Sequence, residues 1–154
     1  MKIDHIAVVV TDLEQAKAFY EKLGFTVGGQ FDVQERYPDE EAPHHYRAVI
    51  LRDEAPDRPV LWLMEPAVQV GPLRRFLARR GPGLHHLGLL TSDIKAETRK
   101  VQEQGIRFLR PAHDFPDDGE IRALIHPHDG QGVLIELLQR TRGGVFQQQT
   151  GSLE

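Results

Sequence analysis

Two histidines and one glutamate offer the clearest chemistry in this sequence. His5 and His86 each lie among aliphatic residues, and Glu136 lies in the apolar run Gly132–Leu138. A carboxylate in such a strand is costly to bury unless it is paired, hydrogen-bonded or bound to a metal. Two imidazoles and one carboxylate are suitable ligands for divalent Co, Mn, Zn or Fe. The sequence therefore predicts a metal site formed by His5, His86 and Glu136.

An internal repeat places the two histidines at equivalent points of two halves. Residues 3–13 align without a gap on residues 84–94. At this offset three pairs of residues coincide: His5 with His86, Asp12 with Asp93, and Gly24 with Gly105. An aspartate before an apolar helical pattern is typical of an N-cap, and a glycine after it is typical of a helix end. Each half is therefore predicted to begin with a strand and a helix.

Each half then continues with three further strands, which makes a duplicated βαβββ module. We place the modules at about residues 1–66 and 84–140, with a linker helix at about 70–80. Two such modules in tandem predict an α+β fold, in which a curved, mostly antiparallel sheet forms a cup and the helices lie outside. We expect one domain over residues 1–140 and a mobile tail over 141–154.

Two loops set the expected limits of the second strand in each half. In the first half a strand begins at Phe25 and ends at Phe31, before a polar loop over 34–43 that holds two prolines. Prolines and polar residues together are typical of a loop. In the second half the repeat predicts a strand over 106–110 and a loop over 111–119.

The last strand of each half shows where the two halves differ. Residues 60–65 align on residues 134–139, which places Trp62 opposite Glu136. Concave protein surfaces tend to bind small molecules, and an aromatic ring offers a stacking surface there. We therefore expect Trp62 to line a substrate pocket.

The remaining histidines and a group of arginines have weaker interpretations. His85 lies directly before His86 on the same predicted strand. Its side chain should therefore point to the opposite face and serve a structural or supporting role. Four other histidines lie near prolines and are expected to be exposed in loops: His44, His45, His126 and His128. Four arginines form either a solvated helix face or a contact for phosphate or carboxylate groups: Arg74, Arg75, Arg79 and Arg80.

Composition narrows the classes of partner. The net charge of −4 favours neither nucleic acid nor an anionic membrane. The chain has no cysteine, which excludes disulfides and thiolate ligands. No apolar run is long enough to cross a bilayer, and the sequence opens on an amphipathic strand rather than a leader. We expect a cytoplasmic protein with a small-molecule substrate.

These motifs resemble the vicinal oxygen chelate superfamily, which includes glyoxalase I, bleomycin resistance proteins, extradiol dioxygenases and fosfomycin-resistance proteins. The resemblance runs from Lys2 to about Gln139. It is strongest to methylmalonyl-CoA epimerase-like members of the superfamily. Three segments carry it: Ile3–Val8, Arg80–Leu87 and Gly132–Leu137.

The resemblance implies a metal-dependent isomerase or lyase in which His5, His86 and Glu136 hold the metal. The most similar activity would be epimerisation of a 2-carboxyacyl-CoA such as methylmalonyl-CoA, through a metal-stabilised enolate. Glu136 would also take part in proton transfer. The arginine group would meet the CoA phosphates, and the chain would form a homodimer.

Two differences from the family pattern leave alternatives open. The family carries a Gln or Glu ligand where this chain has Trp62, and a further glutamate in the region that here reads Pro43–Tyr46. A site with three ligands also suits an Fe(II) extradiol-type dioxygenase or a thiol transferase. The third alternative is a non-catalytic protein that binds a small molecule, with Trp62 as a stacking surface.

Overall fold

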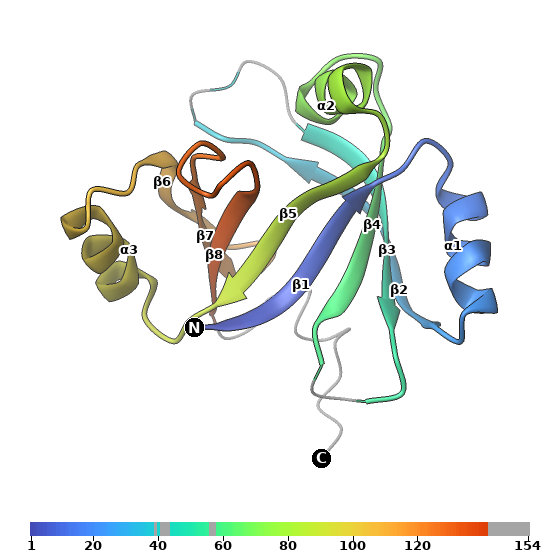
Figure 1. Cartoon of the computed structure of the whole chain (residues 1–154), viewed down its shortest axis with the longest axis horizontal. Helices are drawn as coiled ribbons and strands as arrows, with labels where there is room; N and C mark the ends of the chain where they lie inside the picture. Colours follow the sequence, from blue (N-terminus) through green and yellow to red (C-terminus); the bar gives the residue numbers. More distant parts are fainter. Residues whose placement is uncertain (39, 41–43, 56–57, 142–154) are drawn as a thin grey trace. The chain divides into compact units, whose positions relative to one another are not determined.

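The computed structural model describes residues 1–38, 40, 44–55 and 58–141, and these hold three helices and eight strands (Figure 1). The predicted mobile tail lies, from residue 142 on, outside the described residues. The chain forms two compact units. We call residues 6–85 the first unit, and residues 1–5 together with those from 86 on the second unit. The expectation of a single domain over residues 1–140 stays a prediction.

The first unit holds most of the first βαβββ module. Its strands follow the order β2-β3-β4-β1, and β3 pairs antiparallel with both β2 and β4. The elements of this half are β1 (Lys2–Val9), α1 (Leu13–Lys22), β2 (Thr26–Glu35), β3 (His44–Arg52), β4 (Val60–Pro66) and the linker helix α2 (Pro72–Arg80). The first residues of β1, up to His5, belong to the second unit.

The second unit holds most of the second βαβββ module. Its strands follow the order β5-β8-β7-β6, in which β5 runs parallel to β8 and the other two pairs are antiparallel. The elements are β5 (Gly83–Leu90), α3 (Ile94–Glu103), β6 (Phe108–Phe115), β7 (Glu120–Ile125) and β8 (Leu134–Arg140). The predicted duplication of strand, helix and three strands is therefore present.

The two equivalent helices begin and end in the same way. Asp12 and Asp93 are the N-caps of α1 and α3, and the carboxylate of each accepts a 2.9 Å hydrogen bond from the backbone N–H three residues later. This bond satisfies one of the N–H groups that a helix start leaves unpaired. Gly24 (φ 96°) and Gly105 (φ 80°) follow the helix ends, in a left-handed conformation that favours glycine.

Buried apolar clusters pack on both faces of the strands in the first unit, and one such cluster lies beneath the helix of the second unit. Beneath α1 lie Val10, Leu13, Val49, Leu51 and Leu63. On the face near α2 lie Ala7, Val9, Val33, Tyr46, Ala48, Met64 and Leu73, with Phe31, Trp62, Phe76 and Leu77 packed against them. Beneath α3 lie Ile94, Val101, Ala123, Ile125 and Leu137.

Two strands are longer than the sequence predicts. β2 continues to Glu35, into the predicted loop over 34–43. β6 runs from Phe108 to Phe115, through most of the predicted loop over 111–119. β2 and β6 stand at the ends of the strand order, so each is an edge strand. A proline such as Pro111 is tolerated on an edge strand, because an edge strand can leave its missing N–H unused. The β6–β7 register shifts between Arg110 and His113 around this proline.

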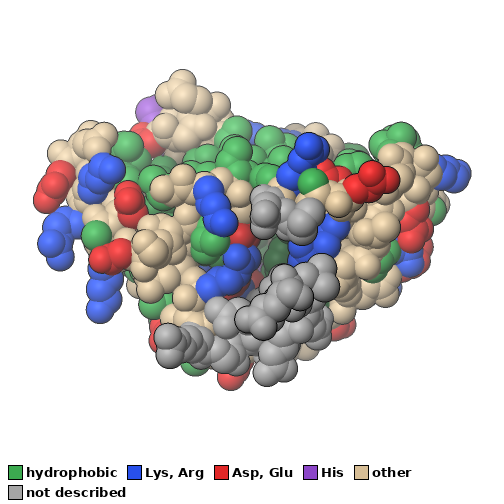
Figure 2. All heavy atoms as spheres, turned by 90° about the horizontal axis from the view of Figure 1, so that it is seen from below, with side chains coloured by type: hydrophobic (Ala, Val, Ile, Leu, Met, Phe, Trp, Pro, Cys, Tyr) green, Lys and Arg blue, Asp and Glu red, His purple; other side chains and the backbone are tan. Residues whose placement is uncertain are grey.

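The surface mixes charges of both signs. On the face drawn in Figure 2, Lys and Arg side chains lie among Asp and Glu side chains, with an apolar area near the upper centre of the view. Among the described residues, no helix has both the length and the apolar character needed to cross a membrane.

Candidate metal centre

The second unit brings the three predicted ligands together. His5 lies on β1, His86 on β5 and Glu136 on β8. One ligand atom from each of them lies within 4.8 Å of the other two. His5 Nε2 is 3.0 Å from His86 Nε2 and 3.6 Å from the Oε1 atom of Glu136. The three side chains therefore converge on one point.

Burial and donor chemistry show that this cluster fits a metal ion. His5 is 5% exposed and Glu136 is 9% exposed. Two imidazole nitrogens this close cannot both present lone pairs to each other without a proton or a cation between them. Two nitrogens and one carboxylate oxygen suit Zn, Mn, Co or Fe(II). Among the described residues it is the one group of three or more such side chains with this spacing.

Gly88 makes room for the cluster. Gly88 lies opposite Glu136 in the parallel β5–β8 pair. A Cβ atom placed on Gly88 would overlap the imidazole ring of His5. Gly88 was not predicted as a site residue from the sequence, and its equivalent in the first half is Ala7. A glycine within a strand often marks the close approach of another group, which is the signal that was available.

Asp4 is a second residue near the site that the sequence pattern does not predict. Its Oδ2 atom accepts a 3.0 Å hydrogen bond from Nδ1 of His5, and its Oδ1 atom is 2.8 Å from the Arg140 guanidinium. Burial alone would raise the pKa of Asp4, but the hydrogen bond from His5 and the charge of Arg140 outweigh it, and the pKa lies below its usual value. Asp4 is therefore a carboxylate at neutral pH.

Trp62 lies in the first unit. Its indole ring stacks on Phe31, with 6.2 Å between ring centroids and 24° between planes. It is half-buried and packs against the apolar cluster near α2. Its role in a substrate pocket stays a prediction.

His85 has a structural environment. Its ring meets Phe76 edge-on, with 5.0 Å between centroids. Burial, together with the nearby charge of His44, lowers the pKa of His85 to about 4. His85 is therefore neutral at pH 7, as suits an aromatic packing partner.

The expectation of four exposed loop histidines is wrong for three of them, since His126 is half-buried although it follows the end of β7. His44 and His45 begin β3 and are half-buried. His44 bonds to the carboxylate of Glu40, and His45 bonds to Asp32 at 2.7 Å. These carboxylates fix both rings at the start of β3. The side chain of His128, by contrast, is 76% exposed.

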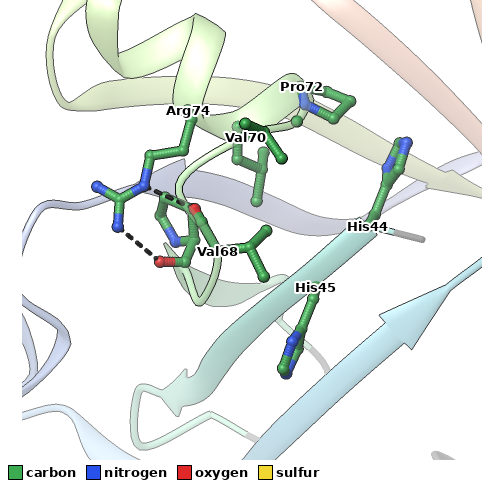
Figure 3. A pocket seen from close by; sticks show the side chains of 9 residues that line it. His44, His45, Val68, Val70, Pro72 and Arg74 are labelled. Carbon is green, nitrogen blue, oxygen red and sulfur yellow. Dashed lines mark hydrogen bonds between the residues drawn. The ribbon is translucent and has the colours of Figure 1, made fainter. Parts of the chain in front are cut away.

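The arginines of α2 divide into two kinds. Arg74 turns back toward the preceding loop and donates hydrogen bonds to the carbonyls of Val68 (2.9 Å) and Pro66 (3.2 Å), as Figure 3 shows. The other three are exposed: Arg75, Arg79 and Arg80. The pocket beside Arg74 holds about 210 Å³ of space not filled by atoms, including open solvent.

Comparisons with known proteins identify the family of the chain. A family described as the glyoxalase/bleomycin resistance protein/dioxygenase superfamily matches residues 4–124. Mitochondrial methylmalonyl-CoA epimerase from Bos taurus is 31% identical over 140 residues, which cover 90% of this chain and 74% of the relative.

Solved structures extend the likeness to the fold. The crystal structure of methylmalonyl-CoA epimerase from Mycobacterium tuberculosis is 28% identical, with a TM-score of 0.70 over 90% of this chain and 87% of the other. A Streptomyces coelicolor methylmalonyl-CoA epimerase variant in complex with 2-nitronate-propionyl-CoA is 27% identical, with a TM-score of 0.70 over 91% and 97%. These likenesses confirm the predicted fold class and the predicted family resemblance.

Proposed function

The chain belongs to the glyoxalase/bleomycin resistance protein/dioxygenase superfamily, and we propose that it is a divalent-metal-dependent epimerase of 2-carboxyacyl-CoA thioesters. Methylmalonyl-CoA is the candidate substrate, since relatives with that activity are similar over about nine-tenths of the chain. The observation that carries the proposal is the convergence of His5, His86 and Glu136, of which His5 and Glu136 are buried. A site of this kind suits a metal ion that would act as a Lewis acid and polarise oxygen atoms of a bound substrate.

The residues of the site would have distinct roles. His5, His86 and Glu136 would hold the metal, which when bound supplies a Lewis acid for the oxygens of the substrate. The Glu136 carboxylate would accept the proton from C2 of the acyl group at one of its oxygens. A second acid would return a proton to the opposite face of C2, so that the proton balance closes and the configuration inverts. Burial of Glu136 would keep bulk water away from this transfer.

Other parts of the proposal rest on the sequence and the family. We propose a homodimer in the cytoplasm that acts on a small molecule. Exposed arginines of α2 (Arg75, Arg79 and Arg80) are candidates for contacts with the CoA phosphates. Arg74 is a weaker candidate, because its guanidinium is bonded to backbone carbonyls.

Isotope exchange tests the proposed reaction. One C2 epimer of methylmalonyl-CoA is incubated in D₂O with the protein and one ion at a time: Co, Mn, Zn or Fe(II). We expect deuterium at C2 together with inversion, both followed by NMR. Glu136→Gln should lose both, because the amide cannot accept the proton. Asp129→Asn is the matched control, since it removes a half-buried carboxylate that is bonded to Arg107 and is not one of the proposed ligands.

Other outcomes separate the alternatives. If no ion supports deuterium exchange at C2, the proposed epimerase activity is contradicted. Oxygen uptake with an iron-loaded protein and an aromatic diol would favour the dioxygenase. Tight binding of a small molecule without metal or turnover would favour the non-catalytic protein.

A further inference from the structure

Asp4 is held from two sides. Its carboxylate accepts the hydrogen bond from His5 Nδ1 at 3.0 Å, and it accepts bonds from the Arg140 guanidinium at 2.8 and 2.9 Å. The side chain of Asp4 is 12% exposed and that of Arg140 is 28% exposed. An ion pair with this little solvent is far less screened than one on the surface. The position of the Asp4 carboxylate is therefore fixed.

This arrangement selects one tautomer of His5. A neutral imidazole carries one N–H and one lone pair, and an ionised carboxylate can only accept a hydrogen bond. The proton of His5 must therefore lie on Nδ1, facing Asp4. The lone pair then lies on Nε2, which is the atom that faces His86 and Glu136. A ligand histidine is often held this way by a carboxylate on its other nitrogen.

Arg140 is held in turn by a row of alternating charges. Glu120 lies opposite Arg140 in the β7–β8 pair, with its Oε1 atom 3.6 Å from the Arg140 Nε atom. The other oxygen of Glu120 accepts a 2.9 Å bond from Arg122, which also donates to Asp118 at 2.9 Å. Glu120 and Arg122 are 7% and 5% exposed. Each charge of the row has a neighbour of opposite sign, although the contact between Arg140 Nε and Glu120 is an ion pair and not a hydrogen bond.

We propose that Asp4 and Arg140 are positioning residues for the metal ligand His5. Asp4 holds His5 in the Nδ1–H tautomer with Nε2 directed at the metal, and Arg140 orients the Asp4 carboxylate. The inference deepens the proposed function, since it assigns two further residues to the same site. Neither residue touches substrate or metal in this scheme; both act through His5.

The test reads the tautomer in metal-free protein and the metal affinity separately. Nitrogen-15 NMR of the imidazole side chains should show His5 with its proton on Nδ1. In Asp4→Ala the proton should move to Nε2 in a large share of molecules, and the dissociation constant for Mn or Zn, measured by calorimetry, should rise about 10- to 100-fold. Asp4→Asn keeps the size of the side chain and should give an intermediate loss. Arg140→Gln should weaken binding by about tenfold or less.

The matched control is a carboxylate–arginine pair of this unit that has no contact with His5 among those described above. Asp129→Ala breaks its bonds to Arg107, and it should leave both the His5 tautomer and the metal affinity unchanged. An unchanged His5 tautomer in folded Asp4→Ala and Asp4→Asn would overturn the inference. So would a changed tautomer with unchanged metal affinity. If wild-type protein binds no ion, the proposed function fails, while the tautomer measurement still decides whether Asp4 fixes His5.

Discussion

The two halves of the chain attach their helices to their sheets with the same contact. Leu13 and Ile94 are equivalent first residues of α1 and α3. The backbone N–H of Leu13 donates to Glu65 of β4 at 3.2 Å, and that of Ile94 donates to Gln139 of β8 at 2.8 Å. Each acceptor is on the last strand of its own half. The duplication thus preserves side-chain contacts as well as the order of elements.

Three residues earlier on the same strands the halves diverge. Trp62 of β4 stacks on Phe31 in an apolar cluster, whereas Glu136 of β8 converges with His5 and His86. The backbone plan is shared, so the difference lies in the side chains of one face. The fold and the chemistry of this chain therefore depend on different residues. Substitutions on that face can measure their effects on stability and on metal binding separately.

The largest predicted effect concerns Gly88, whose equivalent in the first half is Ala7. Gly88→Ala places a Cβ atom in the space of the His5 ring. We expect the affinity for divalent metal to fall by about 100-fold, as measured by calorimetry. Ala7→Gly is the control and should cost about 1 kcal/mol of stability while metal binding is kept. Full metal affinity in Gly88→Ala would contradict the assigned position of His5.

The next effect separates stability from chemistry. Trp62→Ala removes the ring that packs on Phe31, and we expect a loss of about 2 kcal/mol in the free energy of unfolding, because the side chain is only half-buried. Urea denaturation measures this loss. Metal affinity in the same variant should stay within about twofold of wild type. A loss of metal affinity without a loss of stability would contradict the assignment of Trp62 to packing and would place it in the metal site.

The shared helix contacts should have equal and smaller effects. Glu65→Ala and Gln139→Ala each remove the acceptor for one N–H group at a helix start. We expect each to cost about 1 kcal/mol of unfolding free energy. Glu65 also forms an ion pair with Arg47, but Arg47 is exposed, so the loss of this pair should add little to the cost of Glu65→Ala. Costs that differ by more than about 1 kcal/mol would show that the two contacts are not equivalent.

The smallest effect is expected at the residue before the second ligand. His85 aligns on Asp4, but it packs on Phe76 instead of bonding to the neighbouring histidine. His85→Phe keeps a flat ring in that place, and metal affinity should stay within about twofold. Asp4→Ala should lose far more metal affinity than His85→Phe. Equal losses in the two variants would remove the distinction drawn between these positions.

Much of the fold followed from the repeat in the sequence. Asp12 and Asp93 marked the helix starts, and Gly24 with Gly105 marked the ends, because capping depends on local residues. The ends of β2 and β6 could not be predicted. They depend on whether a strand has a neighbour on its second side, which a local pattern does not reveal.

The candidate site was predicted in part for a similar reason. His5, His86 and Glu136 stood out because the repeat selected their positions. Asp4 and Arg140 are far apart in sequence, and alternation along a strand suggests that Asp4 points away from His5. Their contact depends on the folded structure and not on a local pattern, and the same holds for the room that Gly88 leaves. His44 was misjudged because its partner Glu40 was not identifiable from spacing alone.

The central claim is that His5, His86 and Glu136 hold a divalent metal. The direct test is elemental analysis of protein purified without chelators and without added metal, beside Glu136→Ala and the control Trp62→Ala. We predict a stoichiometric divalent metal in the wild type and the control, and its loss in Glu136→Ala. Absence of metal in wild-type protein, even after it is soaked with divalent ions, would contradict the claim. So would an equal metal content in Glu136→Ala.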